Sequence, residues 1–227
     1  MKTFQDMQEG VYDPNIFKAI FLAGGPGSGK SYVVRKTTGG LGMKIVNSDD
    51  IYEKMLKDAG LEPTPEDIFS DKGQEIRVRA KKVTKRMQGN FLTGRLGVII
   101  DGTGKDFEKI KGHRKLYQDL GYDTYMVFVN TSLEVALERN RMRERRLDDK
   151  MVEKMWSEVQ NNLGKFQKLF GPDRMLIVDN SSYSNEEIID QIERQIYRHL
   201  STQIQNPLGK RWLRDNDPRN RDRNKPA

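Results

Sequence analysis

Short apolar runs alternate with charged stretches along most of the chain. Four or five of these runs are rich in β-branched or aromatic residues and have the length of buried strands. The candidate strands are Ala19–Ala23, Lys44–Val46, Val98–Ile100, Tyr125–Val129 and Met175–Val178. Their nearly unbroken apolar character predicts a sheet that is covered on both faces.

Helical patterns lie between the candidate strands. The clearest pattern runs from Asp148 to about Phe170, where apolar side chains recur at three- and four-residue spacing. A later helix is expected to open with the capping pair Ser184 and Glu187. Strands that alternate with helices predict an α/β fold with a mostly parallel sheet, and ligands of such sheets bind beyond the carboxyl ends of the strands.

The composition is that of a globular protein, since 35% of the 227 residues are hydrophobic and 32% are charged. The chain has no cysteine, which excludes disulfides and thiolate metal sites, and its two histidines leave little scope for a His-rich metal site. The first residues, Met1–Pro14, are polar and acidic, unlike a secretory signal. No apolar run approaches the roughly 18 residues of a membrane-spanning helix, so we expect a cytoplasmic protein.

The segment after the first candidate strand has the pattern of a phosphate-binding loop. It matches G-x-x-x-x-G-K-[ST] at every fixed position, and its lysine argues against a dinucleotide-binding loop. We expect Lys30 to bridge the β- and γ-phosphates of ATP and the Ser31 hydroxyl to bind Mg²⁺. The expected ATP-binding residues are Gly24, Gly25, Pro26, Gly27, Ser28, Gly29, Lys30, Ser31 and Tyr32.

Acidic residues follow the second and third candidate strands. We expect Asp49 to act as the general base that takes the proton of the acceptor hydroxyl, and Asp50 to cap the helix that follows. Asp101, after the third strand, is the candidate Mg²⁺ ligand. The alternative is that these acids are helix caps or strand-end turn residues, roles in which aspartate is common.

Five arginines between Arg139 and Arg146 form either a solvated face or a lid over the triphosphate. Arg139 and Arg143 are four residues apart, so they are expected to share one helix face and are the candidate catalytic pair. Arg145 and Arg146 are further options.

A second basic cluster covers residues 77–86, with Ile76, Val83 and Met87 at helical spacing as its expected buried stripe. One hypothesis is that this helix and Arg95 line the site of a polyanionic acceptor such as a nucleic acid. The alternative is a charged outer face on an amphipathic helix.

The net charge of +7 is unevenly spread, because residues 201–227 contain seven basic and three acidic side chains. The apolar periodicity ends at Pro207, so we expect a domain over residues 1–206 and a basic, flexible tail over 207–227. The tail is a candidate nucleic-acid or partner-binding arm. The alternative is that Trp212 and Leu213 dock it onto the domain.

These motifs resemble the zeta-toxin and polynucleotide-kinase-like group of P-loop kinases over roughly residues 16 to 200. Zeta toxins typically carry a Gly-Pro-Gly-Ser-Gly-Lys-type loop, an acid after the second strand and Glu-Gly-Thr-Gly-Arg after the third. Here these places are taken by Gly25–Lys30, Asp49 and Asp101–Lys105. The arginine segment that begins at Arg139 resembles the lid of bacteriophage polynucleotide kinases. The general style resembles kinases of tailed bacteriophages, which act in the host cytoplasm.

The resemblance implies a three-layer α/β/α sandwich with a mostly parallel five-stranded sheet. It also implies an ATP- and Mg²⁺-dependent kinase that phosphorylates a hydroxyl of a nucleic-acid 5′ end or of a nucleotide sugar such as UDP-N-acetylglucosamine. Two other functions stay open at this point. One is a nucleic-acid-binding NTPase that uses ATP hydrolysis as a switch, and the other is an interaction protein with an inert kinase core.

Overall fold

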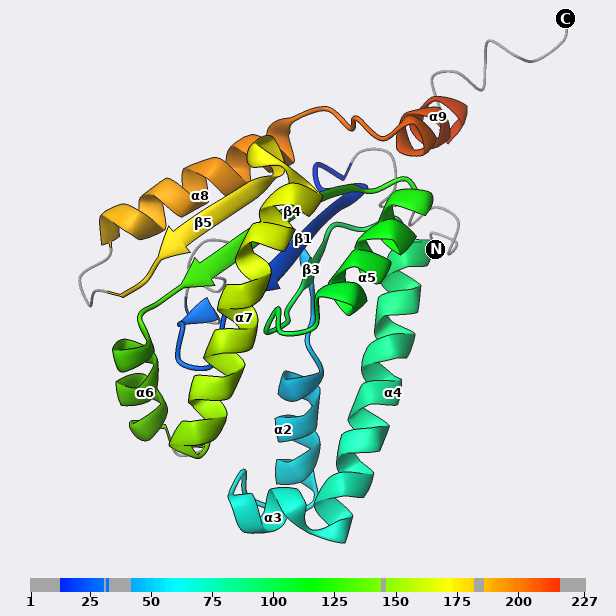
Figure 1. Cartoon of the computed structure of the whole chain (residues 1–227). Coiled ribbons are helices and arrows are strands. Elements are labelled where there is room, and N and C mark those ends of the chain that lie inside the picture. Colours follow the sequence, from blue (N-terminus) through cyan, green and yellow to red (C-terminus); the bar gives the residue numbers. More distant parts are fainter. Residues whose placement is uncertain (1–12, 31, 33–41, 144–145, 182–185, 217–227) are drawn as a thin grey trace, which may run out of the picture.

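The computed structural model describes residues 13–30, 32, 42–143, 146–181 and 186–216. Its five strands form a parallel sheet in the order β2-β3-β1-β4-β5 (Figure 1). The strands are β1 (Lys18–Ala23), β2 (Lys44–Val46), β3 (Val98–Ile100), β4 (Asp123–Asn130) and β5 (Met175–Asp179). The expected α/β class and parallel five-stranded sheet are confirmed.

The described helices connect these strands and also follow the last one. They are α2 (Ser48–Asp58), α3 (Pro65–Phe69), α4 (Asp71–Thr93), α5 (Phe107–Asp119), α6 (Leu133–Arg141), α7 (Asp149–Phe170), the short 3₁₀ helix η1 (Pro172–Arg174), α8 (Glu186–Ser201) and α9 (Pro207–Asn216). The helix expected from Asp148 to about Phe170 is confirmed as α7, with Asp148 as its N-cap. Ser184, the first member of the expected capping pair before α8, lies outside the described residues.

β1 lies in the middle of the sheet, between β3 and β4. Phe21 pairs with Ile100 of β3 on one side and with Met126 of β4 on the other. All residues of β1 and all but the last of β4 are buried. Because parallel strands end at the same edge of the sheet, the segments after β1, β3 and β4 come together there.

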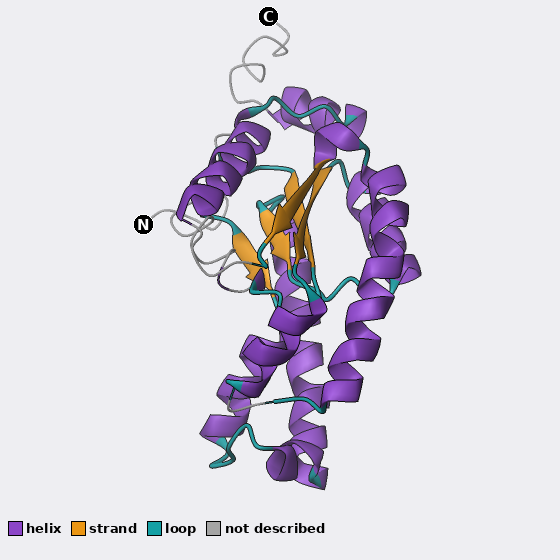
Figure 2. Ribbon diagram, turned by 60° about the vertical axis from the view of Figure 1, so that its left-hand side comes forward, coloured by secondary structure: helices purple, strands orange, loops and turns teal. Residues whose placement is uncertain are grey.

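Helices cover both faces of the sheet, as Figure 2 shows. On one face α5 and α7 pack through buried aromatic side chains, among them Tyr117 and Phe166. On the other face α8 packs through Ile192, Ile196 and Leu200. The result is the expected three-layer α/β/α sandwich.

Helices α2, α3 and α4 form a lobe that extends past the carboxyl edge of the sheet (Figure 1). This lobe has a small core of its own, made of Tyr52, Leu56, Ile68, Ile76 and Ala80. The prediction of a buried apolar stripe on α4 is wrong beyond Ile76, because the Val83 and Met87 side chains are 42% and 38% exposed. The inward positions are half-buried Thr84 and Gln88, and Gln88 Nε2 donates to the Tyr117 hydroxyl at 2.8 Å.

The expectation of a flexible segment from Pro207 is wrong for Pro207–Asn216, which form α9. The Trp212 ring packs edge-on against Phe17, with the two ring centroids 5.4 Å apart. Gly209 lies so close to Gly121 that a Cβ on Gly209 would be 2.4 Å from the Gly121 carbonyl oxygen. The docked alternative therefore describes residues 207–216, and residues 217–227 lie outside the described ranges.

A buried ionic cluster ties this C-terminal segment to the amino-terminal edge of the sheet. Lys18 Nζ lies 3.7 Å from the Asp123 carboxylate and donates to the Thr202 carbonyl at 2.7 Å. The same carboxylate accepts from the backbone N–H groups of Gln205 and Asn206, at 2.7 and 2.9 Å. These contacts satisfy two charges that would otherwise be costly to bury.

His199 is part of the same region, and its ring stacks on Tyr125 with a centroid separation of 4.3 Å. Burial, followed by the Lys18 and Arg174 charges, lowers the pKa of His199 to about 3 against the opposing effect of Asp123. The ring is therefore neutral in the folded protein near neutral pH.

No helix among the described residues is long and apolar enough to cross a membrane.

We expect His199→Phe to make folding less sensitive to acid. The unfolded chain binds a proton at His199 near pH 6.5, whereas the folded chain does so only near pH 3, so stability is lost as pH falls through this window. Phenylalanine removes the titration and can still stack on Tyr125. Between pH 7 and pH 5 the loss of unfolding free energy should be about 2 kcal/mol smaller in the variant. Equal losses for the two proteins in urea titrations would contradict the assignment.

Candidate active site

The glycine-rich loop, Gly24–Lys30, follows β1 at the carboxyl edge of the sheet. The Gly24 N–H donates to the Thr103 carbonyl at 2.9 Å, which joins this loop to the segment after β3. Trp156 of α7 lies beside Gly25, since a Cβ on Gly25 would be 3.6 Å from the Trp156 Cα. The loop is thus held between the elements that follow its two neighbouring strands.

Two glycines of this loop are required by their surroundings. Gly27 has φ +74°, and a Cβ there would lie 2.4 Å from the Ala136 carbonyl oxygen of α6. Gly29 has φ +82°, and a Cβ there would lie 2.3 Å from Asn180 Nδ2. Any larger residue would combine an unfavourable backbone conformation with a collision. This explains why the loop has glycine at both places.

Asn180, directly after β5, is a site residue that the sequence analysis missed. It is buried, and its Nδ2 donates to the Ser28 carbonyl at 2.8 Å. Its backbone N–H donates to the Asn130 carbonyl at the end of β4. The polar residue after the fifth apolar run was the only signal in the sequence. Asn180 fixes the glycine-rich loop relative to β4 and β5.

Lys30 is half-buried and faces charged groups from three directions. Burial lowers its pKa, and the Arg143 charge adds to the effect, while Asp101 and Asp49 oppose it. The two carboxylates therefore do not fully compensate the desolvated ammonium group. Ser31 lies outside the described residues, and the Tyr32 side chain is exposed.

The two acids after β2 lie in the first turn of α2, and both are exposed. The expectation that Asp50 caps this helix is wrong. The N-cap is Asn47, whose side-chain oxygen accepts from the Asp49 N–H at 2.8 Å. Asn47 has the extended backbone of a cap residue, whereas Asp50 is already inside the helix.

Asn47 also connects the carboxylates, a role that the sequence analysis missed. Its Nδ2 donates to Asp50 Oδ1 and to Asp101 Oδ2, both at 3.1 Å. Two like charges are thus held near each other by one neutral amide, which has both of its amide hydrogens available for them. The Asp49 carboxylate receives no bond from Asn47, because only the Asp49 backbone takes part.

Asp101 is half-buried at the end of β3, and its N–H donates to the Val46 carbonyl of β2 at 3.1 Å. Burial raises its pKa, Lys30 opposes this effect, and Asp50 and Asp49 raise the pKa further. A cation bound next to Asp101 would favour its ionised form. Lys30, Asp49 and Asp101 thus lie close enough for their charges to act on one another.

The candidate arginines approach the same loop, but not from one helix face. Arg139 Nη1, from α6, donates to the Asn180 carbonyl at 2.8 Å and lies 3.5 Å from the Gly27 carbonyl oxygen. Arg143 lies beyond α6, which ends at Arg141, so the expected shared helix face is wrong. Its charge nevertheless acts on Lys30. Arg145 lies outside the described residues, and Arg146 is exposed.

The segment between α6 and α7 is shaped by Asn140, another residue that the sequence analysis missed. This asparagine is buried, and its side chain donates to the Leu147 carbonyl at 2.8 Å and accepts from the Leu147 N–H at 3.0 Å. The two bonds imitate the pairing of a neighbouring strand. They hold Leu147 against Asn140, near the end of α6.

A cavity of about 680 Å³ opens beside Asp101, between α4, α5 and the end of β3. Lys81 and Lys85 of the basic helix line this cavity. The arginines of that helix and Arg95 are not among the lining residues. Arg77 instead lies over the Tyr52 ring at 4.9 Å, and Arg95 lies over the Phe17 ring at 5.8 Å.

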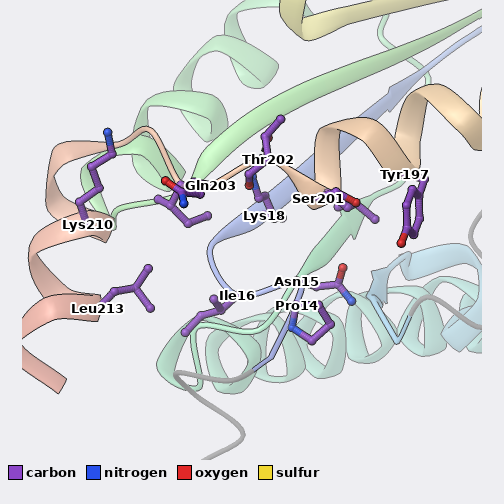
Figure 3. Close-up of a pocket in the computed structure, with 12 residues that line it drawn as sticks. Pro14, Asn15, Ile16, Lys18, Tyr197, Ser201, Thr202, Gln203, Lys210 and Leu213 are labelled. Atoms are coloured by element: carbon purple, nitrogen blue, oxygen red, sulfur yellow. Dashed lines mark hydrogen bonds between the residues drawn. The ribbon is translucent and has the colours of Figure 1, made fainter. Parts of the chain in front are cut away.

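A second cavity, of about 690 Å³, lies at the opposite edge of the sheet, near Lys18 and Thr202 (Figure 3). It is far from the chemistry described above, because β1 separates Lys18 from the glycine-rich loop. Two of its lining residues, Lys18 and Thr202, belong to the ionic cluster that anchors the C-terminal segment.

The residues present fit ATP and Mg²⁺. Glycine-rich loops of this pattern bind phosphates through backbone N–H groups, and a phosphate would compensate the desolvated Lys30. Among the described residues no group of three or more His, Cys, Asp or Glu could hold a metal. Mg²⁺ bound to nucleotide phosphates commonly uses only one or two carboxylates, which Asp101 can supply.

The central strand of the parallel sheet runs into a glycine-rich loop that ends in lysine, and acids follow both strands on one side of it. This arrangement is that of a P-loop kinase-type enzyme, an ATP-dependent phosphotransferase. The chain belongs to the AAA-domain family, whose model matches residues 20–165.

Individual relatives agree with this class. The chain is 22% identical over 183 residues to a cytidylate kinase of Ignicoccus hospitalis, covering 78% of this chain and 98% of that protein. Its fold is similar to shikimate kinase from Bacteroides thetaiotaomicron, with a TM-score of 0.50, 14% identity and coverage of 82% and 99%. It is also similar to a structure of the PezAT toxin-antitoxin system of Streptococcus pneumoniae, with a TM-score of 0.53, 14% identity and coverage of 82% and 88%.

We expect Asn47→Ser to reduce turnover with little change in stability. Serine caps a helix as well as asparagine does, but it has no amide group to hold Asp50 and Asp101 together. By analogy with other residues that orient metal ligands, the loss of turnover should be about 10- to 100-fold, with a higher Mg²⁺ requirement. Steady-state kinetics over a Mg²⁺ series and thermal melts check this. A fall in melting temperature with unchanged kinetics would show that Asn47 is only a cap.

Proposed function

We propose that the protein is a kinase that transfers the γ-phosphoryl group of ATP to a hydroxyl of a nucleic-acid 5′ end or of a nucleotide sugar. The observation that carries this proposal is the meeting of Lys30, Asp49 and Asp101 at one edge of the sheet, beside a cavity that is lined by lysines. Donor and acceptor would bind on opposite sides of Asp101.

The glycine-rich loop would hold the phosphates of ATP, with Lys30 on the β- and γ-phosphates. Ser31 and Asp101 would hold Mg²⁺, which supplies positive charge to the phosphates when it is bound. Arg139 and Arg143 would stabilise the negative charge on the transferred group. Arg139 already contacts the Gly27 carbonyl at 3.5 Å, so a small shift brings its guanidinium group to the phosphates.

Asp49 would act as the general base. It is exposed, and its carboxylate is not engaged by Asn47, which leaves it available to an incoming hydroxyl. The hydroxyl oxygen forms a bond to the γ-phosphorus, the bond from that phosphorus to the β–γ bridging oxygen breaks, and ADP leaves. The hydroxyl proton passes to Asp49.

Two observations favour a nucleotide-derived acceptor. The Ignicoccus relative is a cytidylate kinase, and the cavity beside Asp101 has a cationic lining. A longer nucleic acid would extend over the exposed basic residues of α4, and the tail from residue 207 is a second candidate contact.

The first test of this function is Lys30→Ala, which should abolish transfer. No other side chain of the loop can place an ammonium group against the β- and γ-phosphates. Labelled ATP would be incubated with UDP-N-acetylglucosamine and with a 5′-hydroxyl oligonucleotide, and Lys54→Ala, an exposed lysine of α2, serves as the matched control. Undiminished phosphoryl transfer by the folded Lys30→Ala protein would contradict the proposal.

A second test separates the paired acids. Asp49→Asn should lower kcat by about 10²- to 10⁴-fold and leave ATP affinity nearly unchanged, as expected when a general base is neutralised. Asp50→Asn should have a much smaller effect, because asparagine can still accept the bond from Asn47. If Asp50 proves essential and Asp49 dispensable, the base is assigned to the wrong residue.

A further inference from the structure

Four lysines from three segments surround the cavity beside Asp101. Lys81 and Lys85 are one turn apart on α4, Lys105 lies in the segment after β3, and Lys109 is in the first turn of α5. The α4 pair and the other two lysines belong to different parts of the sequence, so the fold brings them together. All four side chains are exposed to solvent, and together they give the cavity a cationic lining that favours the binding of an anion.

No ion pair involving these four lysines and a carboxylate is found among the described residues. Other lysines of α5 do form ion pairs, since Lys111 lies 3.1 Å from Glu108 and Lys115 lies 2.8 Å from Asp119. Asp106 also lines the cavity, but its carboxylate accepts the Lys109 backbone N–H at 3.0 Å as the cap of α5. The lysines that face the cavity therefore differ from those on the outer side of the same helix.

This cationic cluster is separate from the ATP loop. Neither Lys30 nor Gly24–Gly29 lines the cavity, whereas Ser48 and Asp101 do. An anion bound to the four lysines would thus lie on the other side of Asp101 from the triphosphate. It would belong to the acceptor rather than to ATP.

The apolar part of the lining suits the ring of a bound small molecule. Phe21, Leu92 and Ile110 contribute apolar surface, and the volume of about 680 Å³ is that of a site for one small molecule. His113 lines the cavity as well, and burial, with a contribution from Lys109, lowers its pKa despite the opposing effect of Asp106. Its ring is neutral at pH 7 and can both donate and accept a hydrogen bond.

Building on the proposed function, we propose that the cavity holds a phosphate subsite for the acceptor, formed by Lys81, Lys85, Lys105 and Lys109. The acceptor is then a phosphate ester, with its phosphate on the lysines, its ring on the apolar surface and its free hydroxyl past Asp101 towards Asp49, whose charge acts on Asp101. A phosphate is favoured over a carboxylate because lysines bind phosphate well and four of them match a dianion better than a single charge.

The test is a calorimetric titration of the full chain saturated with ADP and Mg²⁺, so that the ATP loop is occupied. Cytidine 3′-monophosphate and cytidine are the probes, because both have a free 5′-hydroxyl and they differ only in the phosphate. We expect the phosphate ester to bind at least tenfold more tightly. The difference should shrink at least fivefold in Lys81→Gln/Lys85→Gln and in Lys105→Gln/Lys109→Gln.

The matched control is Lys111→Gln/Lys115→Gln, which removes two lysines of α5 that lie outside the cavity. It should bind both probes like the unchanged protein. Equal binding of the two probes would overturn the subsite, and so would an equal loss of binding in the control and in the cavity variants.

Failure of the subsite can be told apart from failure of the kinase function. Lysine-dependent binding of the phosphate ester without transfer to any acceptor would keep the subsite and refute the proposed function. Transfer to neutral nucleosides, with the same KM in the cavity variants, would keep the function and refute the subsite.

Discussion

The parallel alignment of β1 with β3 and β4 is the constraint on which the site depends. The central position of β1 forces the glycine-rich loop to emerge between the segments that follow its two neighbours. The Gly24 contact with Thr103 fixes the loop to the segment after β3, and the Asn180 contact with Ser28 fixes it to the segment after β5. Lys30 and Asp101 are then close enough to influence each other's ionisation. No single loop could provide this arrangement alone.

The two edges of the sheet carry charge in different ways. At the amino-terminal edge the Lys18–Asp123 pair is almost completely buried and bonded to the C-terminal segment. Such a pair contributes specific attachment, since breaking it would leave a buried charge without a partner. At the carboxyl edge the charges are only half-buried and incompletely compensated. This difference separates a structural ionic cluster from one that can receive a ligand.

The sequence predicted those features that depend on local patterns. The central strands β1, β3 and β4 are buried apolar runs, whereas the edge strands β2 and β5 are partly exposed but still mostly apolar, so all five were located to within two residues at each end. The phosphate-binding loop was predictable because glycine, lysine and their spacing are fixed by the chemistry of phosphate binding. The candidate roles of Asp49, Arg139 and Asp101 stay predictions for the experiments above.

Features that depend on long-range contacts were missed. The Asn180 side chain bonds to Ser28, 152 positions earlier in the chain. α9 looked unstructured because a segment with one tryptophan cannot form a core by itself, yet Trp212 packs on Phe17. Val83 and Met87 follow a helical period, but polar Gln88 makes the inward contact at that level of α4.

The choice of asparagine around the active site follows from the charges there. Asn47 bonds to Asp101, Asn180 bonds to Ser28 of the glycine-rich loop, and the buried Asn162 of α7 donates to the Gly104 carbonyl in the segment after β3. An amide can donate and accept at once, so a single side chain can join two segments. A lysine or aspartate in place of Asn47 would add a charge next to Asp101 and shift its ionisation. Neutral amides hold the segments in position without adding charge near the residues that would contact ATP and the acceptor.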